Sequence, residues 1–221
     1  MGRMGGGRAA GSGVGGSAPT VYAWLSLALL AALPYMGSLG NPLIHDDRTI
    51  LDNPWLRDEA GPASVFRHDL WFGTRHAGSD LYRPLTALSL ALNLRFAPGR
   101  GAFHAVNVLL HAGTVLLAAA SLRAILRTLA PTPPSVPPGG RGGLPFAAWA
   151  GAAVFAVHPL ASEAVLLAVG RAEVLAAGLG LAAFLLLVRS ERSDGWGGWP
   201  FAAAVALFLL ALLSKESAAA Q

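Results

Sequence analysis

The chain has 221 residues, of which 54% are hydrophobic and only 13% charged, and its mean hydropathy is +0.52. Soluble globular proteins average about 25% charged residues, so the composition argues against a soluble globular domain. The formal charge of +4 comes from 15 arginines and one lysine scattered among apolar runs, which argues against nucleic acid as a partner. Because cysteine is absent, a disulfide framework, a cysteine zinc site and a thiol nucleophile are excluded.

The N-terminal segment, residues 1–18, holds eight glycines and too little apolar surface to fold, so we expect a disordered tail. The apolar run at 21–39 follows and is about long enough to cross a bilayer as a helix. A cleaved signal peptide is the alternative, although its apolar core is usually shorter. We therefore expect the first membrane span here.

An acidic and aromatic segment, residues 41–83, comes next. Between Asn41 and Leu81, seven acidic residues stand against four arginines. Its aromatic side chains are Trp55, Phe66, Trp71 and Phe72. Because aromatic residues suit the membrane surface, we expect a folded outer loop with amphipathic pieces lying at that surface.

Five further apolar runs follow the outer loop. The first, residues 85–94, would be only about 15 Å long as a helix, half the hydrocarbon thickness, so we expect it not to cross. The others, expected to form membrane helices, are 105–122, 144–157, 172–188 and 199–213. A proline- and glycine-rich flexible linker is expected at 131–143. The predicted fold is an all-α membrane protein, a polytopic helical bundle with a structured first outer loop and a membrane domain at 19–216.

The arginine distribution predicts the orientation in the membrane. If residues 85–94 stay at the outer surface, seven basic residues and two acidic residues face the cytosol, whereas the asymmetry is lost if they span. The first topology is favoured. It places the outer loop, the histidine-rich start of the run at 105–122, residues 158–173 and Lys215-Glu216 on the same, non-cytosolic side.

Asp46 and Asp47 are the candidate catalytic residues, just beyond the first predicted span. Adjacent carboxylates point in different directions, so one can face a substrate while the other meets Arg48 or another supporting group. A carboxylate just outside a bilayer can act as a general base or metal ligand without burial at the membrane centre. The alternative is a helix cap or a solvated turn.

Two basic residues adjoin predicted helices on the same side. Arg83 suits bidentate binding of a phosphate, and the alternative is an interfacial arginine whose charged end extends to water. Lys215, followed by Glu216, lies at the end of the last apolar run.

Three polar residues, His104, Asn107 and His111, have the spacing that places them on one face of a helix. Polar groups inside a membrane helix usually face the bundle interior or a wet cavity. They can bind a sugar or phosphate, or link helices by hydrogen bonds, and both alternatives stay open. A zinc site is not indicated, because the spacing supplies no third protein ligand.

The densest cluster of ionisable residues lies between two apolar runs. Its members are His158, Glu163, Arg171 and Glu173. Pro159 ends the preceding helix and Ser162 is expected to cap the next one. We expect the cluster near one membrane face, where the alternative is a structural salt bridge between Arg171 and either glutamate.

Six strings occur in order along residues 41–216. They are His45-Asp46-Asp47, Tyr82-Arg83-Pro84-Leu85, Phe103-His104-Ala105-Val106-Asn107 with His111, Phe155-Ala156-Val157-His158-Pro159 with Glu163-Ala164-Val165, Gly170-Arg171-Ala172-Glu173, and Ser214-Lys215-Glu216. Together they resemble the N-terminal part of the transmembrane O-mannosyltransferases targeting cadherins.

The resemblance implies a GT-C type glycosyltransferase that moves a sugar, mannose in the animal members, from a dolichyl or other polyprenyl phosphate to a protein hydroxyl outside the cytosol. It maps the catalytic base onto Asp46 or Asp47. From charge, we expect Arg83, His158, Arg171 and Lys215 to bind the lipid phosphate and Glu163 and Glu173 to orient them. His104 and His111 are further candidates for substrate binding. The expected partners are membrane lipid, the polyprenyl-phosphate sugar and acceptor proteins. No tightly bound cofactor is expected, and a divalent metal is not indicated.

Family members are much longer and usually carry C-terminal tetratricopeptide repeats, so we expect this chain to be a fragment or truncated form that ends at residues 217–221. The expected location is the endoplasmic reticulum membrane in a eukaryote or the cytoplasmic membrane in a bacterium. Two other functions stay open: a non-catalytic membrane scaffold or adaptor with the same fold, and an ion-coupled transporter.

Overall fold

The computed structural model describes residues 18–59, 63–74, 78, 81–129, 144–193 and 198–220. The predicted tail, apart from Ala18, and the predicted linker at 131–143 lie outside the described residues. Of the predicted C-terminal end at 217–221, residues 217–220 are described and belong to a short helix.

Every regular element in these ranges is a helix, which confirms the predicted all-α fold. In chain order the elements are α1 (Ala18–Ala32), η1 (Leu33–Gly40), α2 (Asp46–Leu51), η2 (Trp55–Glu59), α3 (Pro84–Phe96), α4 (Arg100–Leu129), α5 (Phe146–Val157), α6 (Ala161–Leu166), α7 (Arg171–Ser193), α8 (Trp199–Ser214) and η4 (Glu216–Ala220).

In the part of the chain that the structure describes, three helical segments are long and apolar enough to cross a membrane: Thr20–Gly40, Arg100–Leu129 and Arg171–Glu191. The first changes from α-helix to 3-10 helix at Leu33, next to Pro34, because proline has no backbone N–H to continue the α-helical pattern. The apolar helices α5 and α8 are shorter. Each predicted span therefore lies in an apolar helix, as expected of an integral membrane protein.

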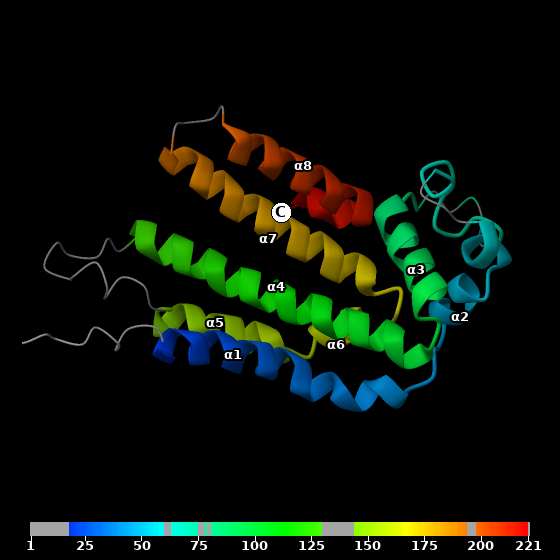
Figure 1. The fold of residues 1–221 in the computed structure, drawn as a ribbon, viewed down its shortest axis with the longest axis horizontal. Helices are drawn as coiled ribbons and strands as arrows, with labels where there is room; N and C mark the ends of the chain where they lie inside the picture. The colour runs from blue at the N-terminus through cyan, green and yellow to red at the C-terminus, as the bar shows by residue number, and fades with distance from the viewer. Residues whose placement is uncertain are drawn as a thin grey trace, which may run out of the picture.

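Helix α4 is the centre of the bundle, with α1 and α5 on one side and α7 and α8 on the other (Figure 1). Small side chains fill the contacts between α1, α4 and α5, where Ala31, Ala119, Ala152 and Ala156 are fully buried. Small residues let membrane helices approach closely enough to pack without a hydrophobic driving force between them. Gly178 of α7 serves the same purpose, because a Cβ there would lie 2.9 Å from the Thr114 hydroxyl of α4.

The described part of the outer loop packs around an apolar core that it shares with α3 and α4. Ile50, Leu56 and Val65 are at most 1% exposed and pack with residues of α3 and α4. The prediction that the loop aromatics lie on the membrane surface is wrong for Trp55, which is 6% exposed. Trp71 is half-buried against this core, and Phe66 and Phe72 are exposed. Packing against α3 and α4 therefore holds the described part of the loop on the bundle.

Helix α3 crosses the end of the bundle and is not parallel to the long helices (Figure 1). Its 13 residues make it about 20 Å long, shorter than the hydrocarbon core, as expected for a segment that does not span. The Thr86 hydroxyl donates a hydrogen bond of 2.9 Å to the Ser214 carbonyl and ties α3 to α8. The outer loop, α3, α6, the start of α7 and the end of α8 thus meet at one end of the bundle.

Candidate functional site

A cavity of about 630 Å³ opens where these elements meet. Its walls come from the start of α2, the middle of α4, the region from Phe155 to Ala177, and Lys215. Seven of the ten predicted site residues line it: Asp46, Arg83, His111, His158, Glu163, Glu173 and Lys215. The other three, Asp47, His104 and Arg171, lie outside the cavity and are buried.

Asp46 is the first residue of α2, and its exposed side chain lines the cavity. The residue before it, His45, has φ 48° and ψ −124°, a strained backbone conformation for a residue other than glycine. Such strain persists only where surrounding contacts hold it. The backbone therefore turns sharply just before the carboxylate that faces the cavity.

Asp47 supplies contacts that hold this turn. Its side chain is 1% exposed, and its two carboxylate oxygens accept the backbone N–H groups of Ala168, at 3.0 Å, and Val169, at 2.9 Å. Burial raises the pKa of the Asp47 carboxyl, and the two backbone N–H groups oppose that shift. Asp47 thus fastens the outer loop to the turn before α7, and only Asp46 of the predicted pair faces the cavity.

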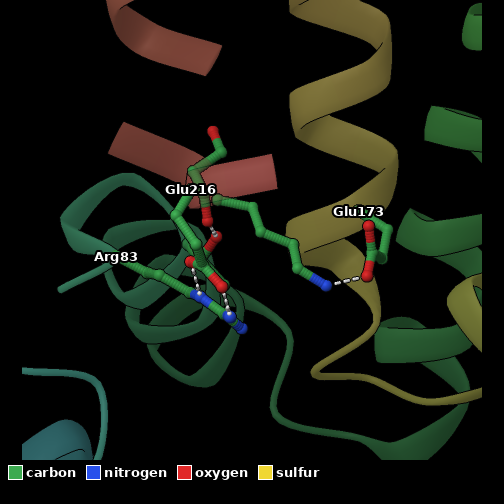
Figure 2. A network of polar contacts seen from close by, with 6 residues as sticks. Arg83, Glu173 and Glu216 are labelled. Carbon is green, nitrogen blue, oxygen red and sulfur yellow. Dashed lines mark hydrogen bonds and ion pairs between the residues drawn. The ribbon is translucent and has the colours of Figure 1, made fainter. Parts of the chain in front are cut away.

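The two cations at the cavity are both paired with glutamates (Figure 2). Arg83 donates from Nε to Glu216 at 2.9 Å and makes a second contact from Nη2 to the same carboxylate, while Lys215 pairs with Glu173. The hydrogen bond from Arg83 lowers the pKa of Glu216. Burial, followed by the charge of Arg83, lowers the pKa of Lys215. The cavity therefore holds its positive charge in two ion pairs.

Arg171 is fully buried, does not line the cavity and makes no salt bridge with Glu163 or Glu173, so the structural pairing considered from the sequence is wrong. Its guanidinium donates to neutral oxygens. They are Asn107 Oδ1 at 2.9 Å, Asn93 Oδ1 at 2.8 Å, the Ser89 carbonyl and hydroxyl at 3.1 and 3.2 Å, and the Phe103 carbonyl at 3.3 Å. A buried charge is costly unless hydrogen-bonded in this way. Arg171 therefore joins α3, α4 and α7. Because its guanidinium is occupied by these oxygens and does not line the cavity, it is not placed to contact a ligand phosphate there.

The residues of α3 that receive Arg171 were missed in the sequence, although a signal was present. Thr86, Ser89 and Asn93 are separated by three and four positions, so they share one helix face. A polar stripe in a short apolar helix indicates a polar partner inside the bundle. Here the stripe meets both Arg171 and the end of α8.

The polar face of α4 links helices, one of the two alternatives left open. The Asn107 amide donates to the carbonyls of Val165 and Leu167, at 3.3 and 2.6 Å, and His111 Nε2 lies 3.1 Å from the Ala156 carbonyl. His111 also lines the cavity. His104 is 1% exposed, and its ring nitrogens have no hydrogen-bond partner among the described residues.

The connection from α5 to α7 forms the cavity rim. His158 follows the last residue of α5, and its Nδ1 accepts the N–H of Leu160 at 3.2 Å. The predicted cap by Ser162 is wrong: Leu160 is the N-cap of α6 without a side-chain cap, and the Ser162 hydroxyl donates to the Pro159 carbonyl. Gly170 is the last residue of the connection. Glycine is required there, because a Cβ would lie only 2.6 Å from the Ala164 carbonyl oxygen.

The inner wall of the cavity was also missed. Thr114, Phe155, Val174 and Ala177 extend the lining between α4, α5 and α7, beyond the ionisable residues. Their mostly apolar character does not distinguish them from lipid-facing residues in the sequence.

Among the described residues no three His, Cys, Asp or Glu side chains are grouped so that they could hold a metal ion.

These features define a helical membrane protein with a charged cavity at one end of its bundle. No protein-family model matches the chain, and no solved structure matches it. It is 35% identical over 186 residues to protein O-mannosyl-transferase Tmtc3 of Drosophila melanogaster, covering 78% of this chain and 19% of that protein. It is 36% identical over 217 residues to human protein O-mannosyl-transferase TMTC1, covering 91% of this chain and 23% of that protein.

Human protein O-mannosyl-transferase TMTC4 is 31% identical over 210 residues, which cover 90% of this chain and 28% of that protein. The chain is therefore homologous to the TMTC protein O-mannosyl-transferases, which confirms the resemblance that the six strings predicted. It spans about a fifth to just over a quarter of the length of these relatives.

Proposed function

We propose that this chain contributes the donor-binding cavity and the catalytic base of a membrane glycosyltransferase. The reaction is transfer of a sugar, mannose by analogy with the relatives' names, from a polyprenyl phosphate to a protein hydroxyl. In a eukaryote the donor sugar is linked to dolichyl phosphate and the reaction takes place at the endoplasmic reticulum membrane. In a bacterium it takes place at the cytoplasmic membrane.

The observation that carries the proposal is one cavity in which Asp46 lies together with Arg83 and Lys215. These three residues come from the outer loop, the start of α3 and the end of α8, separated by up to 169 positions in the chain (215 minus 46). A carboxylate and two cations in one membrane-end cavity are suited to a substrate that presents both a hydroxyl to deprotonate and a phosphate to bind.

The proposed step assigns one task to each charge. Asp46 accepts the proton of the acceptor hydroxyl as its oxygen bonds to the anomeric carbon of the donor sugar. The bond from that carbon to the phosphate oxygen breaks, and the polyprenyl phosphate leaves with the electron pair. Arg83 and Lys215 stabilise the charge that develops on the leaving phosphate. Asp47 and Arg171 hold the outer loop, α3, α4 and α7 in place around these groups.

Donor binding must rearrange the two ion pairs. The cavity lining holds three carboxylates, Asp46, Glu163 and Glu173, and only two permanent cations. A phosphate therefore competes with Glu216 for Arg83 and with Glu173 for Lys215. The glutamates of these pairs are 61% and 47% exposed, whereas the cations are 14% and 20% exposed. Ion pairs that are open to water are worth about 1 kcal/mol or less, so this exchange needs only a modest part of the binding energy.

The non-cytosolic placement of the cavity is part of the proposal. It is supported by the opposite end of the bundle, where Arg123, Arg127 and Arg189 stand against Glu191. The basic residues at the cavity, Arg83 and Lys215, are instead paired with Glu216 and Glu173. An excess of positive charge is typical of the cytosolic end of a membrane helix bundle.

The test is release of free polyprenyl phosphate from a radiolabelled polyprenyl-phosphate mannose donor. It uses the protein in lipid bilayers at the full length of its natural chain, with and without an acceptor peptide. We expect release that requires the peptide and transfers label to it. A folded, membrane-inserted protein that releases no phosphate from mannose, glucose or galactose donors would contradict the proposal and favour the scaffold alternative.

A further inference from the structure

A second cavity, of about 380 Å³, lies at the same end of the bundle. Its charged lining residues are Arg48, Arg57, Arg100 and Asp52, and the remainder is apolar, with Leu43, Leu51, Leu94 and Phe103 among its members. The two cavities share no lining residue. Asp46 and Arg48 are two positions apart on α2, about 200° around the helix, so they serve opposite faces.

The second cavity has an excess of positive charge. Arg57 pairs with Asp52 at 3.2 Å, and its Nε donates to the Leu51 carbonyl at 2.7 Å. Arg48 donates from Nε to the Leu43 carbonyl at 2.7 Å and forms no ion pair with an acidic side chain that the structure describes. The Arg100 side chain makes no ion pair or hydrogen bond within the described part of the chain. Two guanidinium charges therefore remain unneutralised beside an apolar wall.

The position of this cavity along the bundle indicates which molecules reach it. One candidate span ends at Gly40, and Pro42 and Leu43 line the cavity. The next candidate span begins at Arg100, which also lines it. The cavity thus lies where two spans leave the apolar layer, the level of the lipid headgroups. The half-buried Leu43 and Leu94 suit the glycerol and first methylene groups that continue from a headgroup.

We infer that this cavity binds the phosphate of an anionic phospholipid headgroup, through Arg48 and Arg100. Guanidinium groups bind phosphate oxygens in a bidentate manner, and the apolar wall favours a phosphate attached to a lipid over free phosphate. The inference does not depend on the proposed transfer reaction, because none of these residues lines the first cavity.

The test compares lipids that share a phosphate group and differ in net charge. The purified full-length protein in detergent is titrated with phosphatidylglycerol, with phosphatidylcholine or with inorganic phosphate at constant ionic strength. Its thermal unfolding temperature is measured, and retained lipid is counted by native mass spectrometry. We expect phosphatidylglycerol to raise the unfolding temperature and remain bound, and the other two to have little effect.

Two variants identify the site. Arg100→Gln and the double variant Arg48→Gln/Arg100→Gln should weaken phosphatidylglycerol binding by about tenfold or more. Arg95→Gln is the matched control, because Arg95 is an exposed arginine near the C-terminal end of α3 that lines neither cavity. Equal binding of both lipids, full effect from inorganic phosphate, or equal loss in the control and the site variants would each overturn the inference.

Discussion

Asp46 and Asp47 are adjacent in the chain, yet their carboxylates occupy separate environments. Asp46 is exposed and lines the larger cavity, whereas Asp47 is 1% exposed and accepts two backbone N–H groups from the turn before α7. The second carboxylate therefore fixes the position from which the first can act. Substitutions at the two positions should have different consequences.

Replacing Asp47 should lower stability. Asp47→Ala leaves the N–H groups of Ala168 and Val169 without their acceptor, and each buried unsatisfied group costs about 1–3 kcal/mol. Thermal unfolding in detergent should show a lower unfolding temperature, with Asp47→Asn intermediate. Asp52→Ala is the control, because Asp52 is 72% exposed and forms only a surface ion pair with Arg57. Equal stability of the two alanine variants would contradict the role given to Asp47.

Removing the charge of Glu173 should strengthen donor binding. Glu173→Gln releases Lys215 from its ion pair, and an energy of up to about 1 kcal/mol for the pair corresponds to a decrease of up to about fivefold in the donor KM. Glu191→Gln, at the other end of α7, should leave KM unchanged. The measurement is the initial rate of transfer against donor concentration. A higher KM in Glu173→Gln would show that Glu173 itself binds the substrate.

The Arg83–Glu216 pair should make stability depend on pH in the acidic range. Because the hydrogen bond from Arg83 lowers the pKa of Glu216 below its ordinary 4.5, the stabilisation is complete above that value and is lost as the pH falls through the lowered pKa. The difference in unfolding temperature between the wild type and Glu216→Gln should therefore shrink as pH falls from 6 to 3. A difference that stays constant over this range would rule out the pair as its source.

Gly170 should tolerate no larger side chain. Its Cβ position lies 2.6 Å from the Ala164 carbonyl oxygen and 2.8 Å from that of Glu163, so Gly170→Ala forces the backbone to shift. We expect a destabilisation of about 1–3 kcal/mol. Gly113→Ala is the matched control, because nothing lies within 4 Å of that Cβ position and alanine favours a helix interior by about 1 kcal/mol. Thermal unfolding of both variants is measured. We expect Gly170→Ala to lower the unfolding temperature and Gly113→Ala to raise it, and changes of the same sign would contradict this explanation.

The helices of this fold were predictable because long apolar runs in a chain with few charges leave little choice of structure. The runs at 105–122 and 172–188 both lie inside the long helices α4 and α7. The change to 3-10 helix at Leu33 was missed, although Pro34 signals it. The predicted cap at Ser162 failed because α6 already begins at Ala161, so Ser162 lies inside the first turn and its hydroxyl donates to the Pro159 carbonyl.

Seven of the ten predicted site residues line one cavity, but the pairings between side chains could not be predicted. Asp46, Arg83 and Lys215 were expected on one side of the membrane, and they line one cavity. Asp47 bonds to amides 121 and 122 positions away, a contact that no local spacing encodes. Arg171 was expected beside ligand or glutamate, yet its partners are neutral amide, hydroxyl and carbonyl oxygens of α3 and α4. Such pairings depend on how helices pack, which hydrophobic patterning does not specify.

The central claim is that Asp46 is the base of a sugar transfer, and the most direct measurement is the rate of acceptor-dependent polyprenyl phosphate release by Asp46→Asn. We expect this rate to fall at least about 100-fold, while membrane insertion and the unfolding temperature stay like those of the wild type. Glu191→Gln, an exposed acid at the opposite end of the bundle, should keep the full rate. An Asp46→Asn protein that releases polyprenyl phosphate at the wild-type rate would contradict the claim.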